Sequence, residues 1–159
     1  MCDNRLIPSG VIPPAREMKQ FSLGKGHKLC AKIAVDRLFA PSGISHAAIS
    51  FPLRAVWAEN EGRLRGEQVQ FMITVPKKRI RHAVDRVTVR RRVREAYRLQ
   101  RPLLVKPVGE LPLDIAFVYI SNTPEPYARI EKAMKRLLDK IFSVDSAAVA
   151  ASGADGEGA

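Results

Sequence analysis

A group of arginines dominates the chemistry that this sequence could perform. Residues 83–101 read AVDRVTVRRRVREAYRLQR, which places seven arginines among Val, Ala and Tyr. On a helix that turns about 100° per residue, the apolar side chains share one arc and several guanidiniums share the next. The predicted apolar stripe is Val89, Val93, Ala96 and Tyr97, and the predicted exposed row is Arg90, Arg91, Arg94 and Arg98.

Such a row favours a polyanionic partner. Like charges three or four residues apart on a helix repel one another, and only Asp85 and Glu95 are acids nearby. Phosphates would relieve the repulsion, because a planar guanidinium can bind two oxygens at once. The connection PKKRIRH adds four bases, so residues 77–101 hold eleven basic and two acidic side chains, a net charge of +9. A charge run is usually only a solvated helix face, but the one-sidedness of this row favours polyanion binding.

Other groups in the chain do not form a catalytic or metal-binding pattern. A protein nuclease would need clustered carboxylates to hold a metal ion. Glu59 and Glu61 are close in sequence but lie in a connection with no partner signature, and Asp85 and Asp114 are isolated. The three histidines share no metal-ligand spacing with one another or with the two cysteines. The stretch GKGHK at 24–28 lacks the spacing of a phosphate-binding loop. We therefore predict no catalytic residue and no metal site in this chain.

Composition limits the partner and the compartment. The chain has 159 residues, with 27 Lys and Arg against 16 Asp and Glu, a net charge of +11. This length fits one domain, and the basic excess favours nucleic acid or an anionic membrane as partner. No large apolar face accompanies the arginine row, which argues against membrane insertion. Two cysteines, no signal peptide and no apolar run of about 18–20 residues predict a cytoplasmic protein.

The elements that must position the arginines can be read from the chain. Residues 1–20 form a Pro-containing extension expected to be flexible, 21–142 a folded domain with a net charge of +13, and 143–159 an acidic tail expected to be disordered. Within the domain we expect a helix over 27–40 with apolar positions at Leu29, Ile33, Leu38 and Phe39, a β region over 46–59, and a strand over 68–75. A helix over about 80–100 that stops near Pro102, a buried strand over 112–120 and a helix capped by Thr123 follow. The order α-β-β-α-β-α, with a possible extra strand where Pro52 divides the first β region, indicates an α+β sandwich.

The stretch ITVPKKRIRHAVDRVTVRRRVREAYR resembles the core of the bacterial ribonuclease P protein component. In that family a strand ends in Lys-Lys and is followed by a helix reading Ala-Val-x-Arg-Asn-Arg-x-Lys-Arg-x-x-Arg-Glu-x-[Phe/Tyr]-Arg. The residues in register are Ala83, Val84, Arg86, Arg90, Arg91, Arg94, Glu95, Tyr97 and Arg98, with Arg90 in place of the usual Lys. Val87 and Thr88 stand where the family has Asn and Arg, and Val35 stands where many members have an aromatic residue on the first helix.

The resemblance implies a fold, a partner and an activity. The implied fold is an α+β, two-layer sandwich of a mainly antiparallel sheet with helices, ribosomal protein S5 domain 2-like, with a left-handed βαβ crossover. The implied activity is that of a ribonuclease P subunit, an endoribonuclease in which a catalytic RNA removes the 5′ leader of precursor tRNA with Mg²⁺ bound mainly by RNA. The implied partners are ribonuclease P RNA and precursor tRNA, with no membrane and no DNA.

The resemblance also implies roles for particular residues. RNA contacts are implied for Lys77, Lys78, Arg86, Arg90, Arg91, Arg94 and Arg98. In the family a cleft between the sheet and the first helix holds the single-stranded leader. Candidates to stack on leader bases there are Phe39, Phe51 and Trp57, each of which could equally be a core residue. Two other functions stay open: a structural RNA-binding protein (a ribosomal protein or RNA chaperone) without a catalytic role, and a protein-only nuclease.

Overall fold

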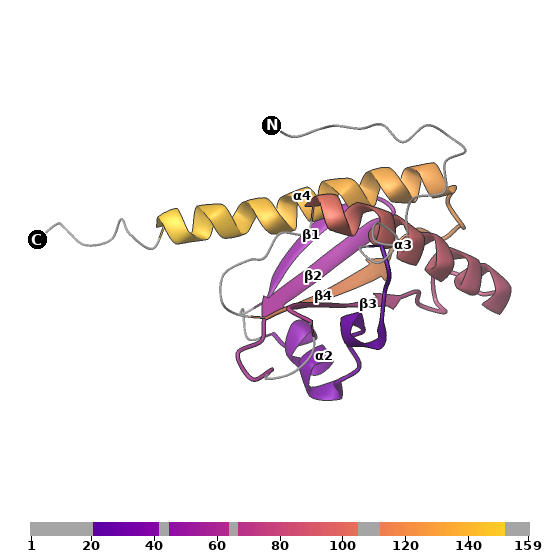
Figure 1. Cartoon of the computed structure of the whole chain (residues 1–159). Helices are drawn as coiled ribbons and strands as arrows, with labels where there is room; N and C mark the ends of the chain where they lie inside the picture. The colour runs from indigo at the N-terminus through magenta and orange to yellow at the C-terminus, as the bar shows by residue number, and fades with distance from the viewer. Residues whose placement is uncertain (1–20, 42–44, 64–66, 105–111, 152–159) are drawn as a thin grey trace, which may run out of the picture.

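Four strands and four helical segments make up the described part of the chain, which comprises residues 21–41, 45–63, 67–104 and 112–151 of a computed structural model (Figure 1). In chain order the elements are η1 (Lys25–His27), α2 (Lys32–Phe39), β1 (His46–Ser50), β2 (Leu53–Glu59), β3 (Val69–Thr74), α3 (Ala83–Leu104), β4 (Leu113–Tyr119) and α4 (Tyr127–Ala151). The predicted α+β class is therefore confirmed. The first β region forms two strands, as the alternative with a break at Pro52 expected.

The strands form one sheet in the order β1-β2-β4-β3. The β1/β2 and β2/β4 pairs are antiparallel, and β3 lies parallel to β4. The sheet is thus mainly antiparallel, as predicted. Because β3 and β4 are parallel neighbours, the chain between them must cross from one end of the sheet to the other, and α3 makes this crossing. The left-handed sense of that crossover stays a prediction.

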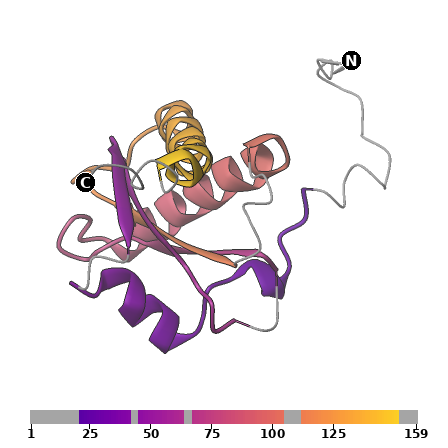
Figure 2. The same ribbon diagram turned by 90° about the vertical axis from the view of Figure 1, so that its left-hand side faces the viewer.

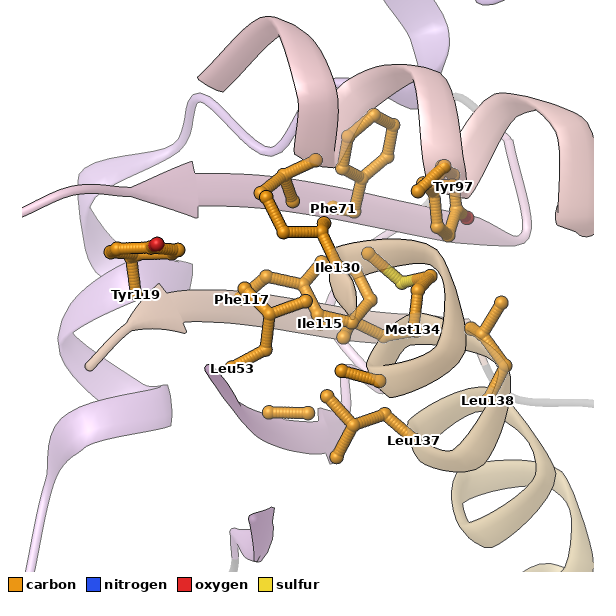
Figure 3. Packing of buried hydrophobic residues seen from close by; sticks show 14 of the residues in the cluster. Leu53, Phe71, Tyr97, Ile115, Phe117, Tyr119, Ile130, Met134, Leu137 and Leu138 are labelled. Carbon is orange, nitrogen blue, oxygen red and sulfur yellow. The ribbon is translucent and has the colours of Figure 1, made fainter. Parts of the chain in front are cut away.

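The main core lies between the sheet and the pair α3 and α4, which cover the same face (Figures 1 and 2). The apolar stripe predicted for α3 is fully buried at Val89, Val93, Ala96 and Tyr97. Figure 3 shows Tyr97 close to Phe71, and their ring centroids are 4.1 Å apart. From α4 the core receives Ile130, Met134, Leu137, Leu138 and Ile141. Burial of each such side chain stabilises the fold by roughly 1.5–3 kcal/mol before conformational entropy is counted.

A smaller core lies on the opposite face of the sheet, where α2 packs (Figure 2). Leu29, Ala34 and Leu38 contact a patch of small side chains on the two central strands, among them Val56 and Ala116. Small residues in these strands let the short helix approach the sheet closely. One helix of eight residues therefore covers only part of this face.

The first helix is shorter than predicted and is rotated differently. Lys28 and Ala31, which lie between η1 and this helix, have extended backbone. Lys28 bridges to Phe71, and the Leu29 amide donates to the Phe71 carbonyl at 3.0 Å. The helix can therefore begin only at Lys32. Ile33, predicted to be apolar and inward, is 78% exposed, and Ala34 occupies the buried position instead.

The two long helices also differ from the prediction at their ends. α3 continues through Pro102 to Leu104, where only the last turn must tolerate the missing proline N–H. α4 begins at Tyr127 and not near Thr123, because Pro124 and Pro126 disfavour helical backbone in the residues before them. α4 then extends to Ala151, so the first part of the predicted 143–159 tail is helical, consistent with its alanine content. Residues 1–20 and 152–159 lie outside the described residues.

Candidate nucleic-acid interface

The side of α3 that faces away from the core carries three arginines without protein partners. Arg90, Arg91 and Arg94 are exposed, and none has a hydrogen bond or ion pair to another residue in the described ranges. The helix is held against the sheet by the buried stripe on its other side, so these guanidiniums are presented outward from a rigid support. We call Arg90, Arg91 and Arg94 the open row. Such donors can bind an oxyanion without first breaking an internal contact.

Arg98, predicted to belong to the same row, forms hydrogen bonds with other groups of the protein. Its guanidinium binds the carboxylate of Glu95 with two hydrogen bonds, and its Nη1 also donates to the Phe21 carbonyl at 3.4 Å. The hydrogen bond from Arg98 lowers the pKa of Glu95, and the same bond raises the pKa of Arg98. Glu95 therefore stays ionised and cancels one positive charge at the end of the open row.

Arg86 and the two lysines lie at the start of α3. Arg86 Nη1 donates to the carbonyls of Ile80 and Arg81, at 3.0 and 2.6 Å, and thereby fixes the connection that leads into the helix. Lys77 and Lys78 are exposed in a turn of that connection. The two lysines lie five and six residues before Ala83, the first residue of α3, so their charge adds to the field at the N-terminal end of this helix.

Three further arginines in this region hold elements together. Arg92 donates to the Glu125 carbonyl at 2.7 Å and joins α3 to the connection before α4. Arg79 donates to the Asn122 side chain, and Arg101 donates to the Ser22 carbonyl at 3.3 Å. Arg91 and Arg92 are neighbours in sequence, yet only the first is open. The rotation of about 100° per residue predicts that Arg91 and Arg92 point in different directions. The partners of Arg79, Arg92 and Arg101 are distant in the chain, so the sequence could not reveal them.

The three aromatic candidates for stacking lie in three different places. Phe39 is 50% exposed at the last residue of α2. Phe51 is 54% exposed in the turn between β1 and β2, with the Arg129 guanidinium 5.9 Å from its ring centre. Trp57 is only 3% exposed and belongs to the core beneath α3 and α4. Because strand pairing turns Trp57 toward that core, its ring cannot border a cleft on the α2 side, and the stacking expectation for it is dropped.

One residue from each of the four strands contributes to a row of polar and apolar side chains on the part of the sheet that α2 leaves uncovered. Arg54 pairs with Ile49 of β1 and with Val118 of β4, and Val118 pairs with Thr74 of β3. Side chains alternate between the two faces of a sheet. Since Leu53 and Ala55 of β2 are in the main core, Arg54 must face the α2 side. Ile49 is 60% exposed and Arg54 is exposed. We call Ile49, Arg54, Val118 and Thr74 the open sheet row.

The acids and histidines of the described residues do not form a catalytic centre. Buried Asp114 is bound by the Arg63 guanidinium and by the Asn60 amide at 2.7 Å. Burial lowers the pKa of His27, which lies 4.0 Å from Glu67. Within the described ranges no three His, Cys, Asp or Glu side chains gather in a way that could hold a metal ion. None of the described helices has the length and apolar character needed to cross a membrane.

The fold is a small α+β domain with a four-stranded sheet, and its helix α3 presents the arginines of the open row to solvent. These features define a class of small basic proteins whose surface is suited to a polyanion such as nucleic acid. The family model described as Ribonuclease P matches residues 26–142. Ribonuclease P protein components from two strains of Porphyromonas gingivalis are each 33% identical to this chain over 123 residues, which cover 76% of this chain and 87% of the relative. The chain belongs to the ribonuclease P protein family, whose known role is tRNA 5′ processing.

Solved structures share the fold. The Staphylococcus aureus RNase P protein superposes with a TM-score of 0.57 at 16% identity, covering 72% of this chain and 94% of that one. A mutant of the same protein, described as defective in mRNA degradation activity, also has a TM-score of 0.57, at 17% identity and with 75% and 90% covered. At such low identity the match supports the arrangement of strands and helices, and it carries no information on individual contacts.

Proposed function

We propose that this chain is the protein subunit of a ribonuclease P that binds the catalytic RNA and the 5′ leader of precursor tRNA. The protein thereby assists endonucleolytic removal of the leader and formation of the mature tRNA 5′ end. The observation that carries the proposal is the open row on α3, which lies within the part of the chain that matches the family. The catalytic centre belongs to the RNA, with Mg²⁺ bound mainly by RNA, and the complex works in the cytoplasm.

The open row and its basic surroundings supply the contact with catalytic RNA. Arg90, Arg91 and Arg94 bind phosphates directly, while Lys77 and Lys78 extend the positive field along the helix start. Arg86 and Arg98 also bind RNA, through those N–H groups that are not used in hydrogen bonds within the protein. Neutralising about half a dozen phosphates makes such binding steeply dependent on salt. No DNA contact and no membrane contact is part of the proposal.

The open sheet row and Phe39 supply the contact with the leader. A single strand is bound by a groove that combines positive charge with side chains on which bases can stack. Arg54 offers the charge, Ile49 and Val118 offer apolar surface, and Phe39 stands exposed at the end of the neighbouring helix α2. Phe51 is a weaker candidate, because Arg129 already lies near its ring.

The decisive experiment measures cleavage of precursor tRNA at low Mg²⁺ with the RNA subunit alone, with this protein alone, and with both. The proposal expects a large gain in rate or substrate affinity when the protein joins the RNA, and no cutting by the protein alone. Annealing of unrelated RNAs without a sharper cut at the tRNA 5′ end would identify a structural RNA-binding protein or chaperone instead. Mg²⁺-dependent cutting without RNA would identify a protein nuclease and overturn the proposal.

A further inference from the structure

A hollow beside the open row has the shape and chemistry of a site for a single nucleotide. It has a volume of about 510 Å³ and lies between α3 and the segment 21–23 that precedes η1. Its α3 side is formed by Arg91, Arg94, Glu95 and Arg98, and Phe21 lines the other side. Ligand sites commonly measure about 300–1,000 Å³, so the hollow has room for one small ligand.

The walls of this hollow are fixed by hydrogen bonds. Arg98 donates to the Phe21 carbonyl at 3.4 Å, and Arg101 donates to the Ser22 carbonyl at 3.3 Å. Next in the chain, Leu23 packs against the main core. The segment that carries Phe21 is therefore bonded to α3 at two successive residues and packed against the core at the third. A site whose walls are already ordered loses less entropy when a ligand binds.

The free groups in the hollow are two guanidiniums and one aromatic ring. Arg91 and Arg94 have no partner in the described part of the chain and are exposed. The Phe21 ring is half-buried, is not part of either core cluster, and has no ring contact with another described aromatic residue. The one acid present, Glu95, is neutralised by Arg98.

We propose that the hollow binds one unpaired nucleotide of the partner RNA, with its phosphate on Arg91 and Arg94 and its base against the Phe21 ring. Phosphate and a planar base are the two groups that this combination of side chains recognises together. A duplex would satisfy the guanidiniums but could not offer a free base to the ring. This inference rests on the proposed function, since it specifies what kind of RNA element the basic face of α3 selects.

Fluorescence of a Phe21→Trp variant tests the stacking contact. A short single-stranded oligoadenylate and a blunt-ended RNA duplex serve as probes, and the wild-type protein, with its buried Trp57, gives the background. We expect the single strand to quench the new tryptophan and the duplex to bind without comparable quenching. Equal quenching by both probes, or none by the single strand, would overturn the inference. Quenching by an acidic peptide at the same charge would assign the hollow to a different partner.

Affinities of Phe21 and Arg90 variants for the two RNA probes distinguish failure of the nucleotide site from failure of the proposed function. Phe21→Ala and Phe21→Leu should each weaken oligoadenylate binding by about five- to a hundredfold, since Leu keeps the apolar bulk but not the plane. Binding of the duplex should not change. Arg90→Ala, which lies outside the hollow, should weaken both probes alike. If catalytic RNA and duplex bind normally and the Phe21 variants match wild type, only the nucleotide site is refuted. If no RNA binds, the proposed function fails as well.

Discussion

The guanidinium of Arg98 holds the carboxylate of Glu95, three residues earlier on α3, with Nε 2.9 Å from Oε2 and Nη2 2.5 Å from Oε1. The same guanidinium donates to the Phe21 carbonyl, and this hydrogen bond links the basic helix to the segment before η1. Glu95 is thus a positioning residue. It orients the Arg98 guanidinium, and its negative charge cancels one positive charge on the RNA-facing side of α3.

This pair gives stability a defined dependence on pH. The Arg98 hydrogen bond lowers the pKa of Glu95 below its ordinary 4.5, so its contribution is complete above that pH and is lost as the pH falls through the folded-state pKa. Both side chains are partly exposed, which limits the effect to at most about 1 kcal/mol. Urea unfolding should show wild type more stable than Glu95→Gln at neutral pH, with the difference fading in acid. A difference that grows in acid would contradict the assignment.

Loss of two open-row arginines should weaken RNA binding without affecting the fold. Arg90→Ala with Arg94→Ala removes exposed guanidiniums that make no internal contact in the described residues. The slope of log affinity against log salt should flatten by roughly one unit for each lost phosphate contact. Arg136→Ala, an exposed position on α4, is the matched control and should change little. Unfolding of the double variant would mean that α3 presents a different face.

The departure from the family motif at Val87 and Thr88 can be reversed. Val87 is exposed, and the Thr88 hydroxyl donates to the Val84 carbonyl at 3.1 Å within the same helix. Val87→Asn with Thr88→Arg should therefore tighten binding to catalytic RNA and steepen the salt slope by about one unit. Val87→Asn with Thr88→Ala adds no charge and should leave the slope unchanged. An unchanged slope in the arginine variant as well would show that this turn of α3 does not face RNA.

The buried pair Arg63–Asp114 should contribute to stability and not to RNA binding. Asp114 is 2% exposed, and Arg63 also donates to the Gln68 carbonyl. Arg63→Met would leave a buried carboxylate without its counter-charge, at a cost of about 3–5 kcal/mol in the free energy of unfolding. Arg37→Met, on the exposed side of α2, should stay within about 0.5 kcal/mol of wild type. Denaturant titration gives both values, and equal stability of the two variants would refute the role of the pair.

A leader contact at Phe39 predicts discrimination between precursor and mature tRNA. Phe39→Ala in the assembled complex should reduce affinity for the precursor by about five- to a hundredfold, the value of one stacked base, while mature tRNA binds as before. Phe51→Ala provides the comparison, because Phe51 is equally exposed but lies in the hairpin turn beside Arg129. A loss shared by precursor and mature tRNA would place the Phe39 contact outside the leader.

The face of α3 could be predicted from sequence because helical rotation is a local property. The four positions of its buried stripe and the three arginines of the open row follow from spacing alone, and the structure confirms the buried stripe. Arg98 was predicted to lie in the exposed row. Its pairing with Glu95 is local, but the sequence gives no sign of its second partner, the Phe21 carbonyl 77 residues earlier. The sequence left Trp57 open between core and cleft for a related reason, since the face that a strand residue occupies depends on register with its neighbours.

The start of the first helix was another part that local patterns could not supply. Because the Leu29 amide is hydrogen-bonded to the Phe71 carbonyl, α2 begins later in the sequence than predicted. This bond joins segments that are far apart in the chain. The hollow beside α3 was missed because Phe21 lies at the edge of the folded domain, where no periodic pattern marks it. In each case a contact between distant segments decided the outcome, whereas regular patterns within one segment were sufficient for the strands and for the bodies of the helices.

The two carbonyl anchors at Phe21 and Ser22 have a practical consequence for anyone who labels this protein. They fix the point at which the N-terminal residues join the folded domain directly beside the open row. A fluorophore or affinity tag attached at Phe21 or Ser22 would lie next to the arginines and compete with RNA for them. The last turn of α4 instead projects beyond the sheet, as Figure 1 shows. Reporters for binding studies therefore belong at the C-terminal end.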